Sequence, residues 1–576
     1  MRRMSDYQPL REERAFLQKK SKRVLPALVV AIGAIIGLAS LTVYKFSYTG
    51  DKKDICTECG IYGPLKPAFT NSLDEIMYDS EYKRGVIDKL AGAIQIPTEI
   101  FDDTPKPSPD LAVWKNFQNL HIYLEEQFPL LYKTLDVENA GGYGLLYTWK
   151  GSNSSLKPLV LMAHQDVVPV DPNTVGSWTH PPFSGFYNDT EDLIYGRGTA
   201  DIKDMVISHL EASEKLIKDG FKPKRTILIS LGCDEEASGA CATDLAKHIE
   251  KRYGRDSIYA ILDEGGGVVE RNGSFFAVPV TAEKGYLDAE ITLFAPGGHS
   301  SVPPDHTSIG ILSKLMASLE NDTYQILVNE TNPAFDTLKC FTKFGAIQDK
   351  NIEKHLIEGS IEKLEATLDY KPEFKYLFKT SQALDVISGG VKANALPESA
   401  TVLVNNRIAL HSSVNETLEH ILLHVRDTAN RFDLGIKVLS GRDATEDNSV
   451  SLKPDTVNGR IVIKLLDPLE PAPISPTIGS EVWNIIAGTT VSMYKEKAFG
   501  GKEANVYVTP ALSTGNTDTK SYWNLTKKIY RYSGGLLIDG TNEHTVDEKN
   551  SGRSLISSVA FMYQYISNVD FYSTES

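Results

Sequence analysis

The sequence predicts an α/β protein: a mostly parallel sheet with helices on both faces, an inserted α+β domain, and a single N-terminal transmembrane helix. Three observations predict it. Apolar runs that suit buried strands alternate with helical spacing between residues 159 and 262. From about residue 283, strand-like runs alternate polar and apolar side chains. Residues 24–44 carry no charge. The length of 576 residues also implies more than one core.

The first 44 residues predict a membrane anchor. Residues 1–23 carry eight Lys or Arg against three acids, which makes a basic tail. Residues 24–44 would form a helix about 30 Å long, enough to span the hydrocarbon layer. The basic tail is expected in the cytoplasm, which gives a single-pass type II protein with a lumenal body. A cleaved signal peptide is the alternative, although its apolar core is usually shorter and ends at small residues.

Short motifs lie on both sides of the anchor. In the tail, Tyr7-Gln8-Pro9-Leu10 fits a sorting signal bound by adaptor proteins, and Lys19, Lys20 and Lys22 could accept ubiquitin; chance explains these patterns equally well. All Asn-x-Ser/Thr tripeptides follow the anchor, as lumenal N-glycosylation requires. The seven predicted glycosylation sites are Asn153, Asn188, Asn272, Asn321, Asn329, Asn415 and Asn524.

Charge and cysteine content exclude two classes of protein. The formal net charge of −15 argues against a nucleic-acid binder, which usually shows a basic face. Cys56 and Cys59 form one Cys-x-x-Cys without a second pair, so a structural zinc site is not expected. A local disulfide and inert thiols both remain open for them. The five cysteines do not make a disulfide scaffold.

The expected domains follow from the change of pattern near residue 283. A lumenal stalk spans 45–84, the larger domain spans 85–282 and 442–576, and the inserted lid domain spans 283–441. In the larger domain we expect strands at 159–163, 225–231 and 257–262 and a helix over 204–218. In the inserted domain we expect strands at 286–294, 399–408 and 436–439, a helix near 309–319, and an exposed helical insertion over 351–368.

Polar side chains cluster where the predicted strands end. His164-Gln165-Asp166, Asp234-Glu235-Glu236 and Asp263-Glu264 each follow an apolar strand. Ligands of open α/β sheets bind at that edge, so these groups are expected to converge. Three consecutive acids are costly to bury without a cation, although a solvated acidic turn is the alternative.

Two further segments complete the candidate site. Asp201 lies in a glycine-containing loop before a helix, where it or Asp204 could instead be an N-cap. His544 lies near the C-terminus. A mixture of His and carboxylates suits zinc with an open position for water. No nucleophile elbow, His-Glu-x-x-His or phosphate-binding loop occurs.

These motifs in this order resemble the co-catalytic metallopeptidase family of aminoacylase and glutamate carboxypeptidase. The shared elements are His-x-Asp after a strand, Gly-Arg-Gly-x-x-Asp-x-Lys, Glu-Glu-x-x-Gly, an acid after the next strand, Gly-Gly-His-Ser-Ser and a late His. The resemblance covers about residues 85–570. The anchor, length and lumenal body look most like the fungal vacuolar carboxypeptidase S group of this family.

The resemblance implies two Zn²⁺ ions per subunit and a role for each motif. His164 and Asp263 would bind one ion, Glu236 and His544 the other, and Asp201 both. Glu235 would be the general base for a zinc-bridging water, and Asp166 would orient His164. The late motif has a rival alignment, since Asp539-Gly540-Thr541-Asn542-Glu543 resembles the family pattern with Asp in place of His. We prefer His544, which keeps the His and the acids Asp547-Glu548.

The inserted domain is expected to contact the substrate. The resemblance implies that His299 reaches the substrate carbonyl and that Asn394 and Arg407 hold its carboxylate. Gly515 would contact the same end through its backbone. The family often has Asp two residues before this arginine, whereas this chain has Asn405.

The function expected from the resemblance is a membrane-anchored zinc metallocarboxypeptidase that releases the C-terminal residue of short peptides in a vacuole-like lumen. An N-acyl-amino-acid hydrolase or synthase of the same chemistry is the first alternative, and an inactive membrane-anchored binding protein is the second. Release of a soluble lumenal form stays open. So do the oligomeric state, with a homodimer as one option, and whether His299 acts in cis or in trans.

Overall fold

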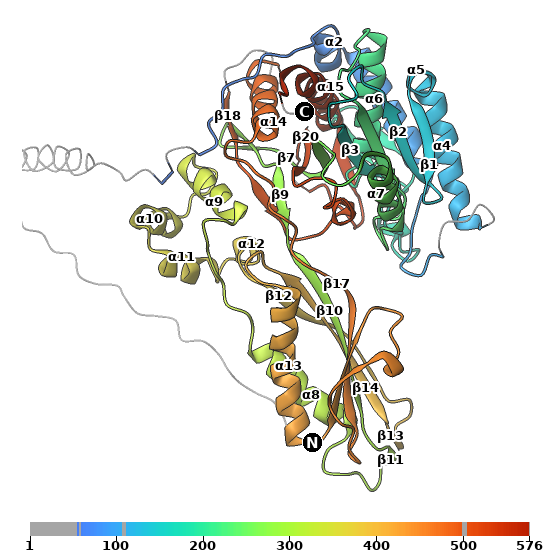
Figure 1. Cartoon of the computed structure of the whole chain (residues 1–576), viewed down its shortest axis with the longest axis vertical. Helices are drawn as coiled ribbons and strands as arrows, with labels where there is room; N and C mark the ends of the chain where they lie inside the picture. The colour runs from blue at the N-terminus through green and yellow to red at the C-terminus, as the bar shows by residue number, and fades with distance from the viewer. Residues whose placement is uncertain (1–54, 57–58, 106–110, 498–503, 539, 575–576) are drawn as a thin grey trace, which may run out of the picture. The chain divides into compact units, whose positions relative to one another are not determined.

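The computed structural model describes residues 55–56, 59–105, 111–497, 504–538 and 540–574. The predicted tail and the predicted anchor at 24–44 lie outside these residues. Within the described ranges, no helix is both long and apolar enough to cross a membrane. The described chain is built on two large sheets, each with its own hydrophobic core (Figure 1).

The larger sheet has parallel strands at its centre. Strands β6, β3, β7 and β20 run parallel to one another, and the pairs β9–β19 and β8–β18 are also parallel. The pairs β1–β2, β2–β6, β7–β8 and β9–β20 are antiparallel. The sheet is therefore mixed, with the expected parallel pairing at its centre and in two outer pairs, and with antiparallel pairs between them. Its order is β1 (Asp136–Ala140), β2 (Gly144–Trp149), β6 (Ile227–Gly232), β3 (Leu159–His164), β7 (Ala260–Arg271), β20 (Ile529–Leu536), β9 (Val280–Glu283) and β19 (Ala511–Ser513), and β8 (Ser274–Ala277) and β18 (Asn505–Val508) pair beside β7.

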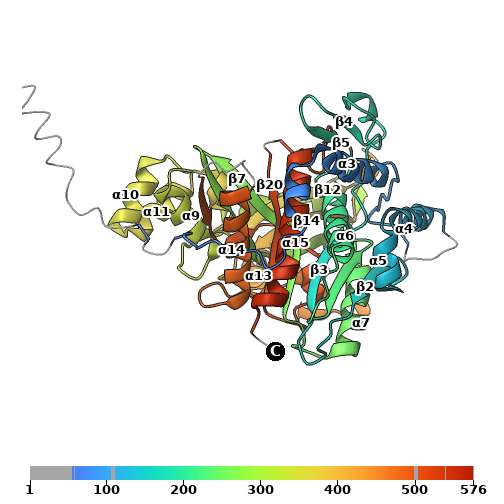
Figure 2. The same ribbon diagram turned by 90° about the horizontal axis from the view of Figure 1, so that it is seen from above.

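Helices cover both faces of this sheet because successive strand residues point to opposite sides. Leu159 and Leu161 of β3 pack in the same core as helix α6 (Lys203–Lys218) and helix α15 (Gly552–Tyr572). Val160 and Met162 pack instead with helix α7 (Ala240–Tyr253). Figure 2 shows α6 and α15 side by side over the strands. The other elements of this domain are α2 (Leu73–Tyr78), α3 (Ser80–Ile94), α4 (Lys115–Gln127), α5 (Pro129–Thr134), α14 (Glu481–Ser492), and a small sheet of β4 (Phe186–Asn188), β5 (Leu193–Tyr195) and β21 (Lys549–Ser551).

The second sheet forms the inserted domain. Strand β14 alternates half-buried and buried residues along its whole length, as the sequence pattern predicts. Helices α8 (Ser308–Asn321) and α13 (Val414–Arg431) share one core with the sheet. The strand order is β12 (Ser381–Gly389), β14 (Ser399–Ile408), β10 (Gly285–Phe294), β17 (Arg460–Leu469), β15 (Gly435–Ser440) and β16 (Val450–Lys453), with a separate pair of β11 (Gly298–His299) and β13 (Ala395–Leu396).

The end of the inserted domain differs from the expectation. Strands β16 and β17 follow residue 441, where we expected the chain to return to the larger domain, yet both lie in the second sheet. Strand β17 pairs with β10 on one side and β15 on the other, so it is an interior strand. The return to the larger domain therefore comes after Leu469. An apolar run such as Ile461–Leu466 fits a strand of either sheet. Only its pairing with β10 and β15 shows that it belongs to the second sheet.

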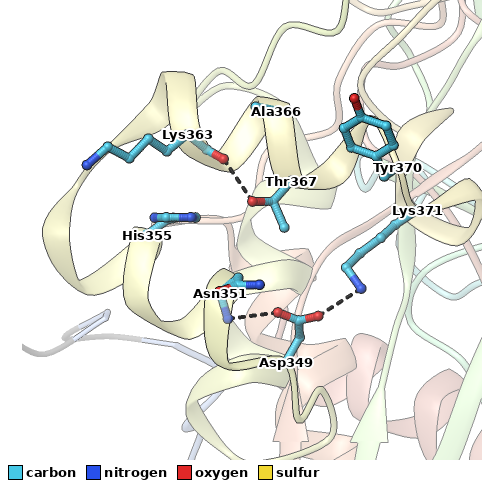
Figure 3. Close-up of a pocket in the computed structure, with 8 residues that line it drawn as sticks. All are labelled: Asp349, Asn351, His355, Lys363, Ala366, Thr367, Tyr370 and Lys371. Atoms are coloured by element: carbon cyan, nitrogen blue, oxygen red, sulfur yellow. Dashed lines mark hydrogen bonds and ion pairs between the residues drawn. The ribbon is translucent and has the colours of Figure 1, made fainter.

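The expected helical insertion over 351–368 forms helices α10 (Lys350–Glu358) and α11 (Ile361–Leu368), between α9 (Pro333–Lys343) and α12 (Pro372–Lys375). These helices are less exposed than expected, because Ile352 and Leu364 are buried against α9 and Leu512 of β19. A cavity lies between them (Figure 3). Its Asp349 accepts hydrogen bonds at the start of α10 and pairs with Lys371 at 2.8 Å, so these contacts are explained by helix capping.

The cysteines and the predicted glycosylation sites also have defined places. Disulfides join Cys56 to Cys59 and Cys233 to Cys241, and Cys340 is buried and free. The seven predicted glycosylation asparagines are all exposed or half-buried. Surface placement is what a glycan requires, and glycosylation itself stays a prediction.

Candidate metal centre

The ends of three neighbouring strands bring the polar motifs together. In the parallel centre of the sheet, β3 pairs His164 with Gly232 of β6, and Leu161 with Leu262 of β7. The residues that follow Gly232 and Leu262 are the acidic motifs. The carboxyl ends of these strands therefore place His164 next to both acidic segments, as expected for an open α/β sheet.

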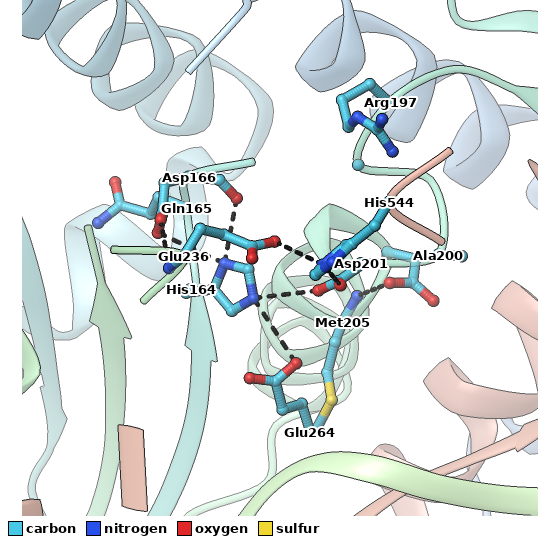
Figure 4. A network of polar contacts seen from close by, with 12 residues as sticks. His164, Gln165, Asp166, Arg197, Ala200, Asp201, Met205, Glu236, Glu264 and His544 are labelled. Carbon is cyan, nitrogen blue, oxygen red and sulfur yellow. Dashed lines mark hydrogen bonds and ion pairs between the residues drawn. The ribbon is translucent and has the colours of Figure 1, made fainter. Parts of the chain in front are cut away.

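Asp201 lies between two histidines that are 380 positions apart in sequence. Its Oδ1 lies 3.2 Å from His164 Nε2, and its Oδ2 lies 2.8 Å from His544 Nε2 (Figure 4). Glu264 Oε2 lies 3.6 Å from His164 Nε2, and Glu236 Oε1 lies 3.3 Å from His544 Nε2. His164 thus lies near Glu264, and His544 lies near Glu236. Both histidines contact Asp201.

The residues of this cluster fit divalent cations. One ligand atom each of His164, Asp201 and Glu236 lies within 4.8 Å of the others, and the same holds for His164, Glu235 and Glu264. Glu236 Oε1 is buried without a hydrogen-bond partner among the described residues. Buried carboxylate oxygens need a partner, and no lysine or arginine of the described chain forms an ion pair with these carboxylates. Imidazole and carboxylate ligands together suit Zn²⁺.

The pKa values of this cluster show how strongly its charges interact. Burial opposes ionisation of Asp201, but hydrogen bonds from His164 and His544 outweigh it and lower its pKa. The nearby carboxylates of Asp201 and Glu236 raise the pKa of His544 to about 10. Burial raises the pKa of Glu264 to about 8 and, together with the Glu264 charge, lifts the pKa of Glu235 well above its usual range. A cation entering the cluster must therefore displace protons, so its affinity rises with pH.

The structure corrects one predicted ligand: Glu264 reaches the cluster, and Asp263 does not. Asp263 is buried beside Arg531, and Thr517 hydrogen-bonds it. The register of β7 against β20 explains the difference. Asp263 pairs with Arg531 but Gly266 pairs with Tyr532, so Glu264 and Gly265 bulge out of the ladder. The sequence pattern of the strand contains no sign of that bulge, which turns the second acid toward His164.

Asp166 has the orienting position that the resemblance implies. Its Oδ1 lies 3.4 Å from His164 Nδ1, and its Oδ2 accepts a hydrogen bond of 3.0 Å from the backbone N–H of Glu236. His164 Nδ1 also contacts the Asp166 backbone carbonyl at 3.0 Å. These contacts leave His164 Nε2 directed at Asp201 and Glu264. One carboxylate therefore fixes a ring on β3 and the acidic loop after β6.

Glu548 anchors the loop that carries Asp201, a role that the sequence analysis missed. Its buried carboxylate accepts hydrogen bonds from the backbone N–H groups of Gly198, Ala200 and Asp201 at 2.9, 3.0 and 3.2 Å. It also pairs with Arg197 at 2.5 Å. The only sequence signal was that an acidic pair follows His544. The loop that carries His544 and Glu548 thus supplies one candidate ligand, His544, and holds the loop that carries another, Asp201.

The contacts of the loop that carries His544 bear on the choice between the two alignments. His544 contacts Asp201 and Glu236, whereas Glu543 lies in the cavity next to them. Asp539 lies outside the described residues. His544 has a φ of +59°, a left-handed conformation that costs free energy and concentrates at functional sites. The geometry therefore agrees with His544 as the histidine of this segment.

The disulfide between Cys233 and Cys241 encloses the acidic loop. Cys233 follows β6 directly, and Cys241 lies in the first turn of α7. Between them, the Asp234 carboxylate accepts hydrogen bonds from Ala240 and Cys241 N–H at 2.9 and 2.8 Å. Glu235 and Glu236 thus belong to a loop that is closed by a disulfide and capped by Asp234. The spacing of these two cysteines in the sequence does not by itself predict the pair.

The inserted domain brings Arg407 to the loop of Gly515. Arg407 NH1 donates to Asn516 Oδ1 at 3.1 Å, and its guanidinium lies 4.7 Å from the Tyr286 ring centroid. Asn405, which replaces the expected acid, donates to Asp288 of the neighbouring strand β10 at 2.7 Å. Asp288 of β10 therefore lies beside the position where the family often has Asp. Two of the predicted substrate-binding residues, Arg407 and Gly515, are therefore brought close together through Asn516.

His299 and Asn394 lie together, but away from this cluster. Strand β11 pairs His299 with Ala395, and Ser300 N–H contacts the Asn394 carbonyl. His299 is exposed, and Ser301 is the partner of its Nδ1. Figure 1 shows β11 and β13 at the end of the second sheet opposite to β9. Within the described chain, these two residues do not contact the candidate ligands.

Comparison with known proteins gives one family. Peptidase family M20/M25/M40 matches residues 160–568. Carboxypeptidase S of Saccharomyces cerevisiae is 43% identical over 525 residues, which are 90% of this chain and 89% of that protein. An N-fatty-acyl-amino acid synthase/hydrolase of Xenopus tropicalis is 30% identical over 498 residues, which are 85% and 86% of the two chains.

Solved structures share the fold. The di-peptidase Dug1p from Saccharomyces cerevisiae has a TM-score of 0.58 at 13% identity, over 88% of this chain and all of that one. An M20 family metallo-carboxypeptidase from Sulfolobus solfataricus has a TM-score of 0.57 at 17% identity, over 84% of this chain and 99% of that one. At these identities the likeness concerns the fold alone.

The correction at Glu264 predicts a difference between two neighbouring acids. Glu264→Gln is expected to weaken metal binding by more than about 100-fold, because it removes a ligand rather than a supporting group. Asp263→Asn is expected to keep the metal. Metal content after dialysis against buffers of graded free metal measures both. Loss of metal from Asp263→Asn, with Glu264→Gln still loaded, would restore the ligand first expected from the sequence.

The anchoring role of Glu548 predicts an effect at a distance from the metal. Glu548→Gln keeps the side-chain shape but weakens the charge-assisted bonds that hold the Asp201 loop. Metal affinity is expected to fall about 10- to 100-fold. Glu191→Gln, an exposed acid near the same loop, is the control and should bind metal normally. Equal affinities of wild type and Glu548→Gln would contradict the role.

Proposed function

The chain belongs to peptidase family M20/M25/M40, and from this premise we propose its substrate, metal and location. It is a metallocarboxypeptidase related to carboxypeptidase S. We propose that it releases the C-terminal residue of short peptides with two Zn²⁺ ions per subunit. The observation that carries the proposal is Asp201, whose two carboxylate oxygens face two different histidines. That arrangement offers two adjacent cation positions with one shared ligand.

The proposed ligand sets follow the contacts. His164 and Glu264 would hold one ion, His544 and Glu236 the other, and Asp201 both. When bound, two zinc ions supply Lewis acidity and lower the pKa of water toward neutrality. Asp166 keeps the His164 ring oriented from behind, through Nδ1.

Glu235 is the proposed general base. It follows β6 within the disulfide-closed loop, beside Glu264 and His164. Its carboxylate takes a proton from the attacking water and later donates that proton to the leaving nitrogen. Its neighbour Glu236 faces His544, so the two consecutive acids have different roles. Partial burial of Glu235 keeps bulk water from competing for the proton.

Arg407 is the proposed reader of the substrate's free carboxylate. Its guanidinium offers a planar fork that matches a carboxylate, and Asn516 and Tyr286 hold it in place. Gly515, next to Asn516, has its backbone N–H turned toward the Ser513 hydroxyl at 3.1 Å. A substrate carboxylate at this position would favour cleavage of the C-terminal peptide bond.

We propose that His299 and Asn394 act in a homodimer. His299 is exposed and does not contact the candidate ligands of its own chain among the described residues. A second copy could bring its His299 to the metal centre, where an imidazole would stabilise the oxyanion. Crosslinking and sedimentation of the purified chain, with mixed variants in which one copy lacks His299, would test this arrangement.

We propose a vacuolar lumen as the location, with residues 24–44 as the anchor. The uncharged run, the basic tail and the surface positions of seven glycosylation tripeptides support it. Sorting adaptors or ubiquitin would act on the tail, and proteolysis of the stalk would release a soluble form. Protease protection and glycosidase sensitivity of the full chain in microsomes would test the topology.

A second candidate function uses the same chemistry on N-acyl amino acids. The 30% identity to an N-fatty-acyl-amino acid synthase/hydrolase favours it, although the identity to carboxypeptidase S is higher. Arg407 would hold the amino-acid carboxylate in both cases. Parallel assays of N-blocked dipeptides and fatty-acyl amino acids would separate the two. We expect the blocked dipeptides to have the higher kcat/KM.

The role of Glu235 predicts a variant that binds metal without turnover. Glu235→Gln is expected to keep the metal content of wild type and to lower kcat by about 10²- to 10⁴-fold, because it removes only the proton carrier. Steady-state assays with a blocked dipeptide and metal analysis of the same sample measure the two effects. Unchanged kcat would disprove the proposed base.

The role of Arg407 predicts a selective loss of affinity. Arg407→Met is expected to lower kcat/KM about 10- to 100-fold for peptides with a free C-terminus, since a hydrogen-bonded charge contributes about 1.5–3 kcal/mol. C-terminally amidated peptides should be poor substrates of both enzymes. Arg442→Met, on an exposed arginine that pairs with Asp467, is the matched control. Equal losses on free and amidated peptides would refute a carboxylate-binding role.

A further inference from the structure

The helices of the inserted domain carry two histidines and an acid that the proposed function does not use. His420 and His424 lie four residues apart on α13, so both side chains lie on one face of the helix. Asp322 follows the last residue of α8 and faces the same point. We propose that Asp322, His420 and His424 form a separate site for a divalent transition-metal ion of the Zn²⁺ class.

The distances between the potential ligand atoms suit one small ion. One atom of each residue lies within 4.8 Å of the others, and His424 Nε2 lies 3.2 Å from Asp322 Oδ2. The two imidazole ring centroids are 5.3 Å apart. Ligand bonds of about 2.0–2.2 Å in a tetrahedral site separate the ligand atoms by about 3.4 Å. Small side-chain rotations would therefore bring all three to one ion.

The chemistry of the three groups also indicates an ion rather than a simple ion pair. His424 Nε2 is buried and has no hydrogen-bond partner of good geometry among the described residues. His420 Nε2 contacts the Asp322 backbone carbonyl at 2.9 Å, a hydrogen bond that a metal bond would replace. No lysine or arginine of the described chain forms an ion pair with Asp322. Two imidazoles and one carboxylate are a preferred set for Zn²⁺, Ni²⁺ and Cu²⁺.

The surroundings make the site well defined. The Tyr324 ring lies 4.3 Å from the His420 ring, and its hydroxyl donates to the Thr417 carbonyl on α13. The side chain of His424 is only 12% exposed, whereas that of Asp322 is 54% exposed. The ion would therefore approach from the side of Asp322, and water would fill its open positions. It would join the end of α8 to the middle of α13 and stabilise the folded state.

Metal counting on the tag-free full chain tests the site. The chain is equilibrated with micromolar Zn²⁺, and zinc per chain is measured with peptidase activity on the same sample. Asp322→Asn keeps the backbone carbonyl and the Asn321-x-Thr323 tripeptide, so it leaves the predicted glycosylation site intact. Asp322→Asn and His424→Gln should each bind one zinc fewer than wild type. Their activity should be retained, since neither residue belongs to the proposed active site.

A matched histidine separates metal binding from general effects of substitution. His355 of α10 is 13% exposed and lies 3.8 Å from Glu358, but no second histidine contacts it among the described residues. His355→Gln should bind as much zinc as wild type. If Asp322→Asn and His424→Gln remain active and also bind as much zinc as wild type, the proposed site is refuted. The proposal is independent of the active-site zinc, because the catalytic ligands are unchanged in all these variants.

Discussion

The packing of many carboxylates at one sheet edge is the constraint on which the rest of this structure depends. Asp201, Glu235, Glu236 and Glu264 lie close to His164 or His544. Hydrogen bonds from the histidines lower the pKa of Asp201, whereas burial raises the pKa values of Glu235 and Glu264. Burial of these groups without a cation would cost several kcal/mol. Two divalent ions would neutralise the cluster and, at the same time, supply its chemistry. The fold therefore places a costly cluster of carboxylates at the sheet edge where we propose that the metal ions bind.

Several contacts far apart in sequence exist to hold that cluster. Glu548, near the C-terminus, accepts the N–H groups of the loop that presents Asp201. Asp166 links the His164 ring to the backbone of Glu236. The disulfide between Cys233 and Cys241 closes the loop that carries Glu235. Candidate ligands from three chain segments thus have fixed orientations before any ion binds, which lowers the entropic cost of binding.

The inserted domain supplies the residue that we propose as the source of substrate selectivity. Strand β14 carries Arg407 to Asn516, so the proposed carboxylate-binding residue of the second sheet contacts a loop of the first. The residues before and after Arg407 follow a regular alternation, and the sequence predicted the bounds of this strand. The end of the same domain was not predictable, because the apolar pattern of β17 fits either sheet and its pairing with β10 and β15 is a long-range event.

The sequence by itself determined the strands that end at His164 and Gly232, the helix after Asp201, and most of the candidate site, because local periodicity and strand ends are written in neighbouring residues. Tertiary structure alone decided that Glu264 and not Asp263 faces His164, since that depends on a bulge between β7 and β20. It also decided the anchoring by Glu548, the Cys233–Cys241 pair, and the meeting of Asp322 with His420 and His424. Each of these joins residues through packing between elements, and no local pattern in a single sequence encodes such a contact.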